Sequence, residues 1–309
     1  MLADQIAYVA LVSSDPATAA GVFERHFGLP RAELSSPTGK VPVFALGRSA
    51  LAVFPPRHPL VDGEARPGVH HLAFGVDDLD AAATSAASAG IAAEAPATVG
   101  LGGRRARRLS RGATAGVRIV LTERLGLAAR DGGPVERLDH VGVASSDVRE
   151  DEAVFCGRLG FAVESRQTDM EVAMAVESFT SDKYGVVYHT RPPQPVGGLR
   201  IIFVTVGDCE LEFLANFDPR QGGEVEHGRA GTTRQDQGAV ARFVASRGRG
   251  LHHFAVKARD IGALLAGMAA AGLPMIDTVG RPGSRRALIG FPHPRALGGI
   301  LMHVVQRPD

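Results

Sequence analysis

The segments Tyr8-Val-Ala-Leu-Val-Ser-Ser-Asp15 and His140-Val-Gly-Val-Ala-Ser-Ser-Asp147 align at an offset of 132 residues, and this repeat decides the fold. Further along, His70-His-Leu-Ala-Phe-Gly-Val-Asp-Asp78 aligns with His252-His-Phe-Ala-Val-Lys-Ala-Arg-Asp260 at an offset of 182. Self-similarity at a fixed spacing indicates duplicated structure. The chain of 309 residues therefore contains two copies of one unit, and the second copy has 50 additional residues.

A shorter period lies within each copy. An alternating apolar stretch leads into an aspartate, and an alanine-rich stretch follows, at Asp15, Asp78, Asp147 and Asp260. Aspartate at this point predicts a helix N-cap, because its carboxylate accepts hydrogen bonds from backbone N–H groups that have no intrahelical partner. The four helices are expected to end at glycines in the left-handed conformation, namely Gly28, Gly90, Gly160 and Gly272. Strand-like runs follow each helix, which predicts four strand–helix–strands modules paired into two α+β domains.

The domain boundaries follow from the repeat. We expect a first domain at residues 1–125, a linker at 126–135 that contains an Asp-Gly-Gly-Pro turn cluster, and a second domain at 136–309. The additional residues of the second domain are expected in insertions at about 165–200 and 216–248, the first of them near the mouth of the second domain's cavity.

Composition excludes several classes of partner. Thirty-four Lys and Arg residues balance 33 Asp and Glu residues, so there is no excess positive charge to hold a nucleic-acid backbone. The sequence has neither the basic start of a signal peptide nor an apolar run long enough to span a bilayer. Two cysteines, Cys156 and Cys209, favour a reducing compartment. We expect a cytoplasmic protein, a monomer or a homodimer, without nucleic-acid or membrane partners.

Four polar side chains of the second copy interrupt apolar strands, where burial is costly unless they are paired or ligated: His140, Glu212, His253 and His303. Their equivalent places in related modules predict one shared polar centre. Imidazole and carboxylate together suit one divalent transition metal, namely Fe, Co, Zn, Mn or Ni, so all four residues are candidate ligands, and His303 is alternatively a base. His303 lies in a final strand expected at residues 298–305. Glu210 shares a strand face with Glu212, so it is either a general base or a solvated carboxylate.

The first copy lacks this set. The offsets place Tyr8, Ala52 and Val120 at the positions of His140, Glu212 and His303, and only His71 is retained. One ligand does not hold a metal, so the first domain is expected to pack against the second and to close its cavity.

Two further features have alternative interpretations. The neighbouring histidines His70 and His252 are expected on the opposite strand faces, with structural roles. The arginines at 104–108, together with Arg111, could hold a phosphate-bearing substrate, although a solvated hairpin is favoured.

The repeat resembles the vicinal oxygen chelate superfamily, which includes glyoxalase I, extradiol dioxygenases, antibiotic-resistance proteins and methylmalonyl-CoA epimerase. The resemblance implies tandem domains, each of two paired βαβββ modules that form a curled half-barrel sheet with helices outside. Residues 137–305 are most similar to the methylmalonyl-CoA epimerase family, through the stretches at 138–144, 206–214, 240–254 and 291–299. By this resemblance, His140, Glu212 and His253 occupy three metal-ligand positions.

Two departures from the epimerase family affect the reaction. The fourth ligand position, a glutamate in the epimerases, is His303 here, and no acid precedes Leu199 where the second catalytic carboxylate is expected. The leading hypothesis is still an isomerase or epimerase that acts through a metal-stabilised enolate on a small substrate with vicinal oxygens, with His303 and Glu210 as candidate catalytic groups. The alternatives are an Fe(II) ring-cleaving or keto-acid dioxygenase and a non-catalytic small-molecule binding or resistance protein.

Overall fold

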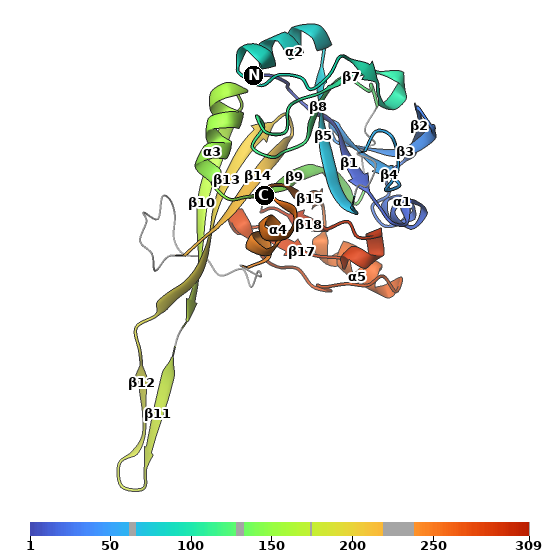
Figure 1. Ribbon diagram of the computed structural model, residues 1–309. Coiled ribbons are helices and arrows are strands. Elements are labelled where there is room, and N and C mark those ends of the chain that lie inside the picture. Colours follow the sequence, from blue (N-terminus) through green and yellow to red (C-terminus); the bar gives the residue numbers. More distant parts are fainter. Residues whose placement is uncertain (62–65, 128–132, 174, 219–237, 309) are drawn as a thin grey trace.

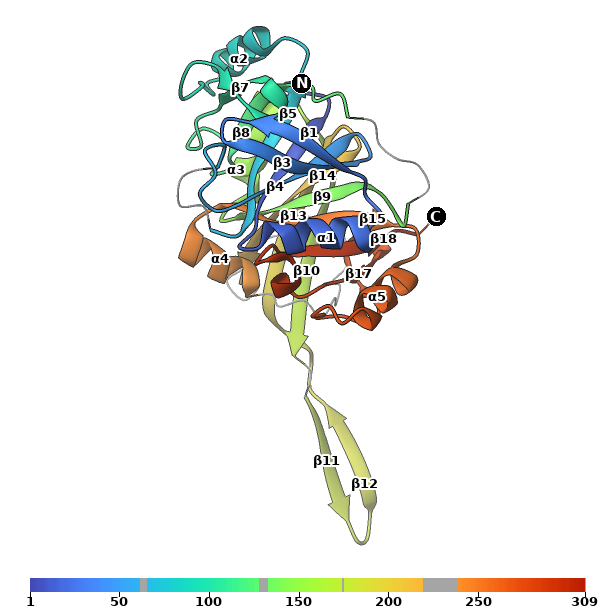
Figure 2. The same cartoon turned by 90° about the vertical axis from the view of Figure 1, so that its right-hand side faces the viewer.

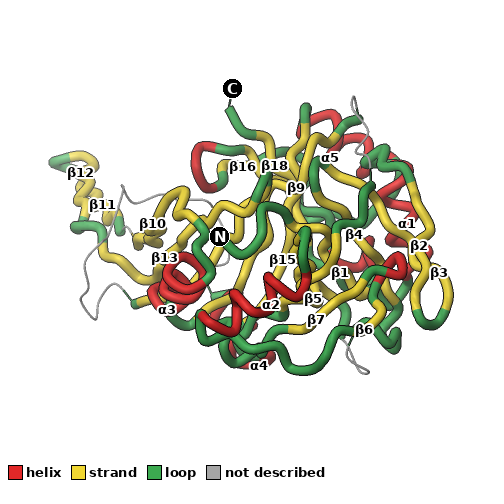
Figure 3. Tube along the Cα trace, turned by 90° about the horizontal axis from the view of Figure 1, so that it is seen from above, coloured by secondary structure: helices red, strands yellow, loops and turns green. Residues whose placement is uncertain are grey.

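Two eight-stranded sheets follow each other along the chain (Figure 1). The computed structural model describes residues 1–61, 66–127, 133–173, 175–218 and 238–308. Both sheets are curled and have the same strand order, and the helices lie around the outside of the strands (Figure 3). The expected fold of two α+β domains built from paired βαβββ modules is confirmed.

The first sheet is built from two modules that pair through β1 and β5, which run antiparallel. Across the sheet its strands are β2 (Arg31–Ser36), β3 (Gly39–Leu46), β4 (Ser49–Phe54), β1 (Ile6–Val12), β5 (Gly68–Val76), β8 (Ile119–Glu123), β7 (Arg105–Arg108) and β6 (Thr98–Val99).

The second sheet repeats this arrangement through β9 and β15. Across the sheet its strands are β10 (Ala162–Ala173), β13 (Gln194–Val206), β14 (Cys209–Phe217), β9 (Val135–Ser145), β15 (Gly250–Ala258), β18 (Met302–Gln306), β17 (Leu288–Gly290) and β16 (Arg281–Pro282). Its last long strand is shorter than expected. Residues 298–301 precede β18, because Gly298 and Gly299 have positive φ angles of 60° and 95° and continue from the 3-10 turn η5 (Pro294–Leu297).

Four of the five described α-helices begin where the sequence predicts, and the one within the second expected insertion was not predicted. The five are α1 (Pro16–Arg25), α2 (Leu79–Ser88), α3 (Val148–Glu152), which continues into the π-helical turn η2 (Ala153–Arg158), α4 (Ala239–Arg247) and α5 (Ile261–Ala270). The carboxylates of Asp15, Asp78, Asp147 and Asp260 each accept a backbone hydrogen bond as N-caps of α1, α2, α3 and α5. The glycines predicted to end these helices have φ angles between 62° and 78°. Both sets of predictions are confirmed.

Strand register supports the equivalence of the two copies. Ala10 pairs with Ala52 in the first sheet, and Gly142 pairs with Glu212 in the second, so Ala52 occupies the place of Glu212. On the other side of each sheet, Ala73 pairs with Val120 and Ala255 pairs with His303. Ala52 and Val120 of the first copy are therefore the structural equivalents of Glu212 and His303 in the second.

The two halves share one apolar core. Its buried side chains come from both sheets and from the helices that cover them. Aromatic contacts cross between the halves, with ring centroids 6.3 Å apart for Phe23 and Phe254 and 5.5 Å apart for Phe74 and Phe161. The first half thus packs on the second, as expected. The division into domains at 1–125 and 136–309 remains a proposal, and much of the linker (residues 128–132) lies outside the described residues.

The first insertion forms an arm. Strands β11 (Val176–Ser181) and β12 (Gly185–Thr190) pair as a two-stranded ribbon that projects away from both sheets (Figures 1 and 2). Its aromatic side chains, including Tyr184 and Tyr188, are exposed. The expectation that this insertion lies near the cavity mouth was wrong for the ribbon, since none of residues 176–190 lines the cavity of the second domain, but it holds for Leu199 at the end of the insertion, which does. Residues 219–237 of the second expected insertion lie outside the described residues. No described helix combines the length and apolar character needed to cross a membrane.

Candidate metal centre

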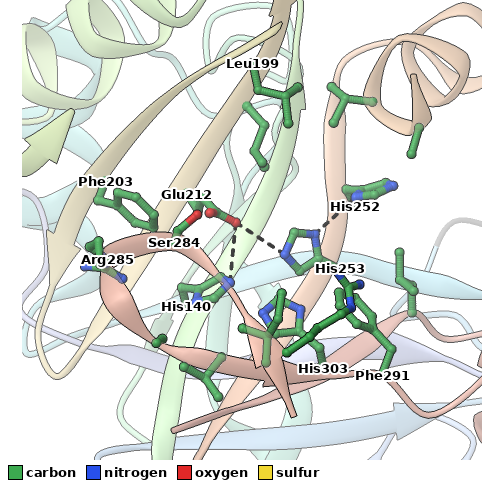
Figure 4. A pocket seen from close by; sticks show the side chains of 18 of the residues that line it. His140, Leu199, Phe203, Glu212, His252, His253, Ser284, Arg285, Phe291 and His303 are labelled. Atoms are coloured by element: carbon green, nitrogen blue, oxygen red, sulfur yellow. Dashed lines mark hydrogen bonds and ion pairs between the residues drawn. The ribbon is translucent and has the colours of Figure 1, made fainter. Parts of the chain in front are cut away.

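Three imidazoles and one carboxylate meet on the inner face of the second sheet. They come from four different strands: His140 from β9, Glu212 from β14, His253 from β15 and His303 from β18. Strand pairing brings them together, since β9 lies between β14 and β15, and β18 lies next to β15. Each of the four residues is at most 7% exposed. The structure therefore gathers all four predicted residues in one buried cluster (Figure 4).

The distances within the cluster are short. One ring nitrogen from each of His140, His253 and His303 lies within 4.8 Å of the other two. The Oε2 atom of Glu212 lies 3.4 Å from Nε2 of His140 and 3.3 Å from Nε2 of His253. Among the described residues, Nε2 of His140 and Nδ1 of His303 are buried without a hydrogen-bond partner. Unpartnered buried nitrogens beside a carboxylate are the donor set that a transition metal requires.

A carboxylate stands behind His140. The Oδ2 atom of Asp139 lies 2.7 Å from Nδ1 of His140, so Nε2 of the same ring points into the cluster. Asp139 is completely buried and also accepts hydrogen bonds from Arg307. Burial alone would raise the pKa of Asp139, but the His140 hydrogen bond and the Arg307 charge outweigh it and hold the pKa far below its usual range. Sequence reasoning missed Asp139, although its position next to His140 in an apolar strand was a usable signal.

His252 also belongs to this site, contrary to expectation. The pairing of β15 with β9 shifts register between Leu251 and His253, which marks a β-bulge. The bulge turns the His252 ring toward the same cavity, where its Nδ1 lies 3.1 Å from Nδ1 of His253. A strict two-residue alternation predicted the opposite face, and the bulge is the reason that this prediction failed. His252 therefore fixes the His253 ring, so that Nε2 of His253 faces Glu212.

Burial lowers the pKa of three imidazoles at this site. Loss of solvent lowers the pKa of His253, and it lowers the pKa of His303 still further, with added repulsion from His140 and His253. The pKa of His252 falls to about 3 for the same reason. Burial would raise the pKa of Glu212, but His140 and His253 reverse this effect and its pKa is lowered. Neutral imidazoles and an ionised carboxylate are the forms in which these side chains bind metals.

A cavity of about 370 Å³ opens beside the cluster. Its walls are largely apolar and include Leu199, Phe203, Leu214 and Phe291. All described residues that line it come from the second half. The expectation that the first half closes this cavity was therefore wrong, because first-half residues such as Phe23 pack against core residues such as Phe254, which do not line the cavity.

Glu210 is not brought into the cluster. Its carboxylate pairs with Arg285 at 3.4 Å, and it is not among the described residues that line the cavity. Arg285 does line the cavity: its guanidinium lies 3.7 Å from the ring centroid of Phe203 and also pairs with Glu164. Glu210 thus holds Arg285 in place at the cavity wall.

Arg285 and Arg286 hold a backbone shape that favours glycine. Their φ angles are 55° and 60°, and the equivalent positions of the first copy are Gly102 and Gly103, with φ angles of 68° and 71°. A left-handed conformation at a residue with a side chain costs about 1 kcal/mol. The second copy therefore retains two arginines at a turn where the first copy has unstrained glycines.

The first copy has no comparable cluster among its described residues. His71 survives, and its Nε2 lies 3.3 Å from the hydroxyl of Tyr8, which occupies the place of His140. Burial raises the pKa of Tyr8, so the phenol stays neutral. The phenol and the imidazole form a hydrogen-bonded pair here, and this half packs on the second through the shared core.

The duplicated fold and the buried histidine cluster define a class of protein: tandem βαβββ domains with a candidate metal centre in the second domain. The chain belongs to the Glyoxalase/Bleomycin resistance protein/Dioxygenase superfamily, whose family models match residues 5–118 and residues 139–291. This confirms the resemblance seen in the sequence. No curated protein sequence matches the chain.

Three solved structures are similar to the chain to different degrees. A mutant of 4-hydroxymandelate synthase from Streptomyces coelicolor is similar over 100% of this chain and 94% of its own, with a TM-score of 0.63 and 18% identity. Methylmalonyl-CoA epimerase from Mycobacterium tuberculosis is 19% identical over 60% of this chain and 95% of its own, with a TM-score of 0.39. The epimerase from Streptomyces coelicolor, solved with 2-nitronate-propionyl-CoA, is 21% identical over 57% of this chain and 96% of its own, with a TM-score of 0.37.

Proposed function

We propose that the chain is an enzyme that uses one divalent transition metal, held by His140, Glu212 and His253, to isomerise or epimerise a small substrate with two neighbouring oxygens. The observation that carries this proposal is the approach of the Glu212 carboxylate to Nε2 of both histidines, at 3.4 and 3.3 Å, inside a buried cluster. Ligand atoms about 2.1 Å from a tetrahedral metal lie about 3.4 Å from each other. These two separations match those expected of donor atoms around one metal and support the proposal.

When bound, the metal supplies a Lewis acid that stabilises negative charge developing on a substrate oxygen. Asp139 keeps His140 oriented, and His252 does the same for His253. The apolar walls exclude water from the substrate. A cavity of about 370 Å³ suits a small molecule.

We assign the proton transfer to His303. Its ring lies 4.9 Å from that of His140 and 5.0 Å from that of His253, centroid to centroid, so it faces the same point as the metal-holding residues. The lowered pKa of His303 keeps its imidazole unprotonated and therefore able to accept a proton from the substrate. The C–H bond beside the substrate carbonyl breaks, the proton moves to an imidazole nitrogen of His303, and the electron pair moves toward the carbonyl oxygen. The proton then returns to the other face or to the adjacent carbon.

The test measures isotope exchange. Protein loaded with Co(II) or Zn(II) is incubated in D₂O, under nitrogen, with a panel of small 2-oxo acids, 2-hydroxy ketones and acyl thioesters. Deuterium is expected at the carbon next to a carbonyl with the wild type and not with H253A, which loses the metal. H303A is expected to keep the metal and lose the exchange. Loss of the metal in H303A would instead make His303 a fourth ligand, and exchange that persists without metal contradicts the proposal.

A second candidate is an Fe(II) dioxygenase. The observation that favours it is the tandem layout, in which one half carries the whole cluster and the other half packs on it. Oxygen consumption by the Fe(II)-loaded protein with catechols or keto acids would identify this activity. A protein that takes up no transition metal would instead be a small-molecule binding module.

A further inference from the structure

A second cavity, of about 420 Å³, lies between the two halves. We propose that this cleft, called the basic cleft here, binds the phosphate group of a small molecule. Five arginines line it: Arg66, Arg111 and Arg118 from the first half, and Arg247 and Arg249 from the second. No aspartate or glutamate is among the described residues that line it. In a chain whose formal net charge is only +1, this is a strong local concentration of positive charge.

The fold builds the cleft where the repeat brings equivalent strands together. Strands β5 and β15 both begin at its edge, with Gly68 and Gly250 in the lining. The φ angle of Gly250 is 151°, and a Cβ atom there would lie 3.2 Å from the carbonyl oxygen of Gly116. A Cβ atom at Gly116 would lie 2.9 Å from the carbonyl oxygen of Arg249. Glycine thus permits the close backbone approach that forms this side of the cleft.

Two of the arginines, Arg111 and Arg247, make contacts with uncharged groups. Arg111 donates to the carbonyl oxygens of Gly116 and Arg249, at 2.9 and 3.0 Å, and so ties the halves together. The guanidinium of Arg247 lies 5.4 Å from the Phe243 ring centroid, with a hydrogen bond of 3.4 Å to the carbonyl oxygen of Pro67. These partners are neutral.

Three carboxylates outside the lining contact these arginines and offset part of their positive charge. Asp151 and Glu150 pair with Arg249, and Glu94 accepts a hydrogen bond from the backbone N–H of Arg111. Guanidinium groups converging on one space are the usual recognition element for phosphate, which accepts several charge-assisted hydrogen bonds at once.

The basic cleft adjoins the candidate metal centre. His252 lines both cavities and bonds to His253. A phosphate group bound in the cleft therefore belongs either to a substrate whose reactive part lies in the first cavity or to a separate molecule. The site is independent of the metal in both cases, so it is testable whether or not the proposed function holds.

The experiment is calorimetric titration of the full chain, freed of metal with EDTA, with pyrophosphate. Saturable binding is expected, and Arg247→Met is expected to weaken it at least tenfold, because one charge-assisted contact is lost. Arg247 is exposed, so its replacement leaves the fold intact. Arg118→Met should act in the same direction. Arg104→Met removes the same charge from an exposed turn outside the cleft and should change the affinity less than twofold.

Two results would overturn the proposal: no saturable binding at millimolar pyrophosphate, or an equal loss in R104M and R247M. A second arm locates the source of the phosphate by titrating 3-phosphoglycerate into metal-free and Zn(II)-loaded protein. Tighter binding with zinc that is lost in both R247M and H253A indicates one molecule spanning the two cavities. Equal binding that is lost in R247M alone indicates a separate ligand. Both results place the phosphate in the basic cleft and support the proposed site.

Discussion

Replacing Asp139 with asparagine should weaken metal binding although Asp139 touches no metal. Its carboxylate lies 2.7 Å from Nδ1 of His140 in a fully buried position. The hydrogen bond fixes the ring so that Nε2 points into the cluster, and the negative charge makes that nitrogen a better donor. Substitution of such partners usually costs 10–100-fold in metal affinity, which is about 1.4–2.7 kcal/mol. Because asparagine can still accept from Nδ1 but carries no charge, we expect a loss near the middle of this range.

The assay is competition for Co(II) against a chelator of known affinity, with folding checked by thermal denaturation. The matched control is Asp151→Asn, because Asp151 is also completely buried and pairs with an arginine, Arg249. Both variants remove the charge of a buried carboxylate that pairs with an arginine. Only D139N should lose metal affinity. The reasoning is refuted if folded D139N binds Co(II) as tightly as the wild type, or if D151N loses as much.

Three other predictions concern the same chain. Gly142→Ala should reduce metal affinity at least tenfold without removing a ligand, since its Cβ atom would lie 2.0 Å from Cε1 of the His253 ring. Competition for Co(II) with a chelator measures the affinity, and circular dichroism should show unchanged strand content. Arg286→Gly should raise the free energy of unfolding by about 1 kcal/mol in urea titrations, because it relieves a left-handed conformation; a loss of stability would contradict it. Burial raises the pKa of Asp151 to about 6, so the folded state holds a proton that the unfolded state releases. Stability should therefore fall as pH rises from 4 to 6, and D151N should remove roughly 3 kcal/mol of this dependence in urea titrations across that range.

The repeat made most of the fold predictable. Two constant offsets revealed the duplication. The capping aspartates and the terminal glycines then marked the helix ends, because a helix start needs a hydrogen-bond acceptor and its end a positive φ angle. The four cluster residues were predictable for a related reason. A charged or imidazole side chain in an apolar strand needs a partner, and equivalent positions in paired modules converge on one point.

The failures have equally local causes. His252 reaches the cavity through a bulge, which breaks the two-residue alternation and leaves no clear mark in the sequence. Asp139 was missed because a strand neighbour is expected to point away, whereas its short side chain bends back to the His140 ring. The basic cleft joins Arg118 and Arg247, which lie 129 positions apart in the chain, so only the packing of the two halves reveals it.

Anomalous diffraction from crystals soaked with Zn(II) or Co(II) tests the central claim most directly. We predict one anomalous peak per chain, within bonding distance of Nε2 of His140, Nε2 of His253 and Oε2 of Glu212, and none near His71 in the first half. The absence of any peak at this cluster, or a peak bound only by other residues, would contradict the proposed metal centre.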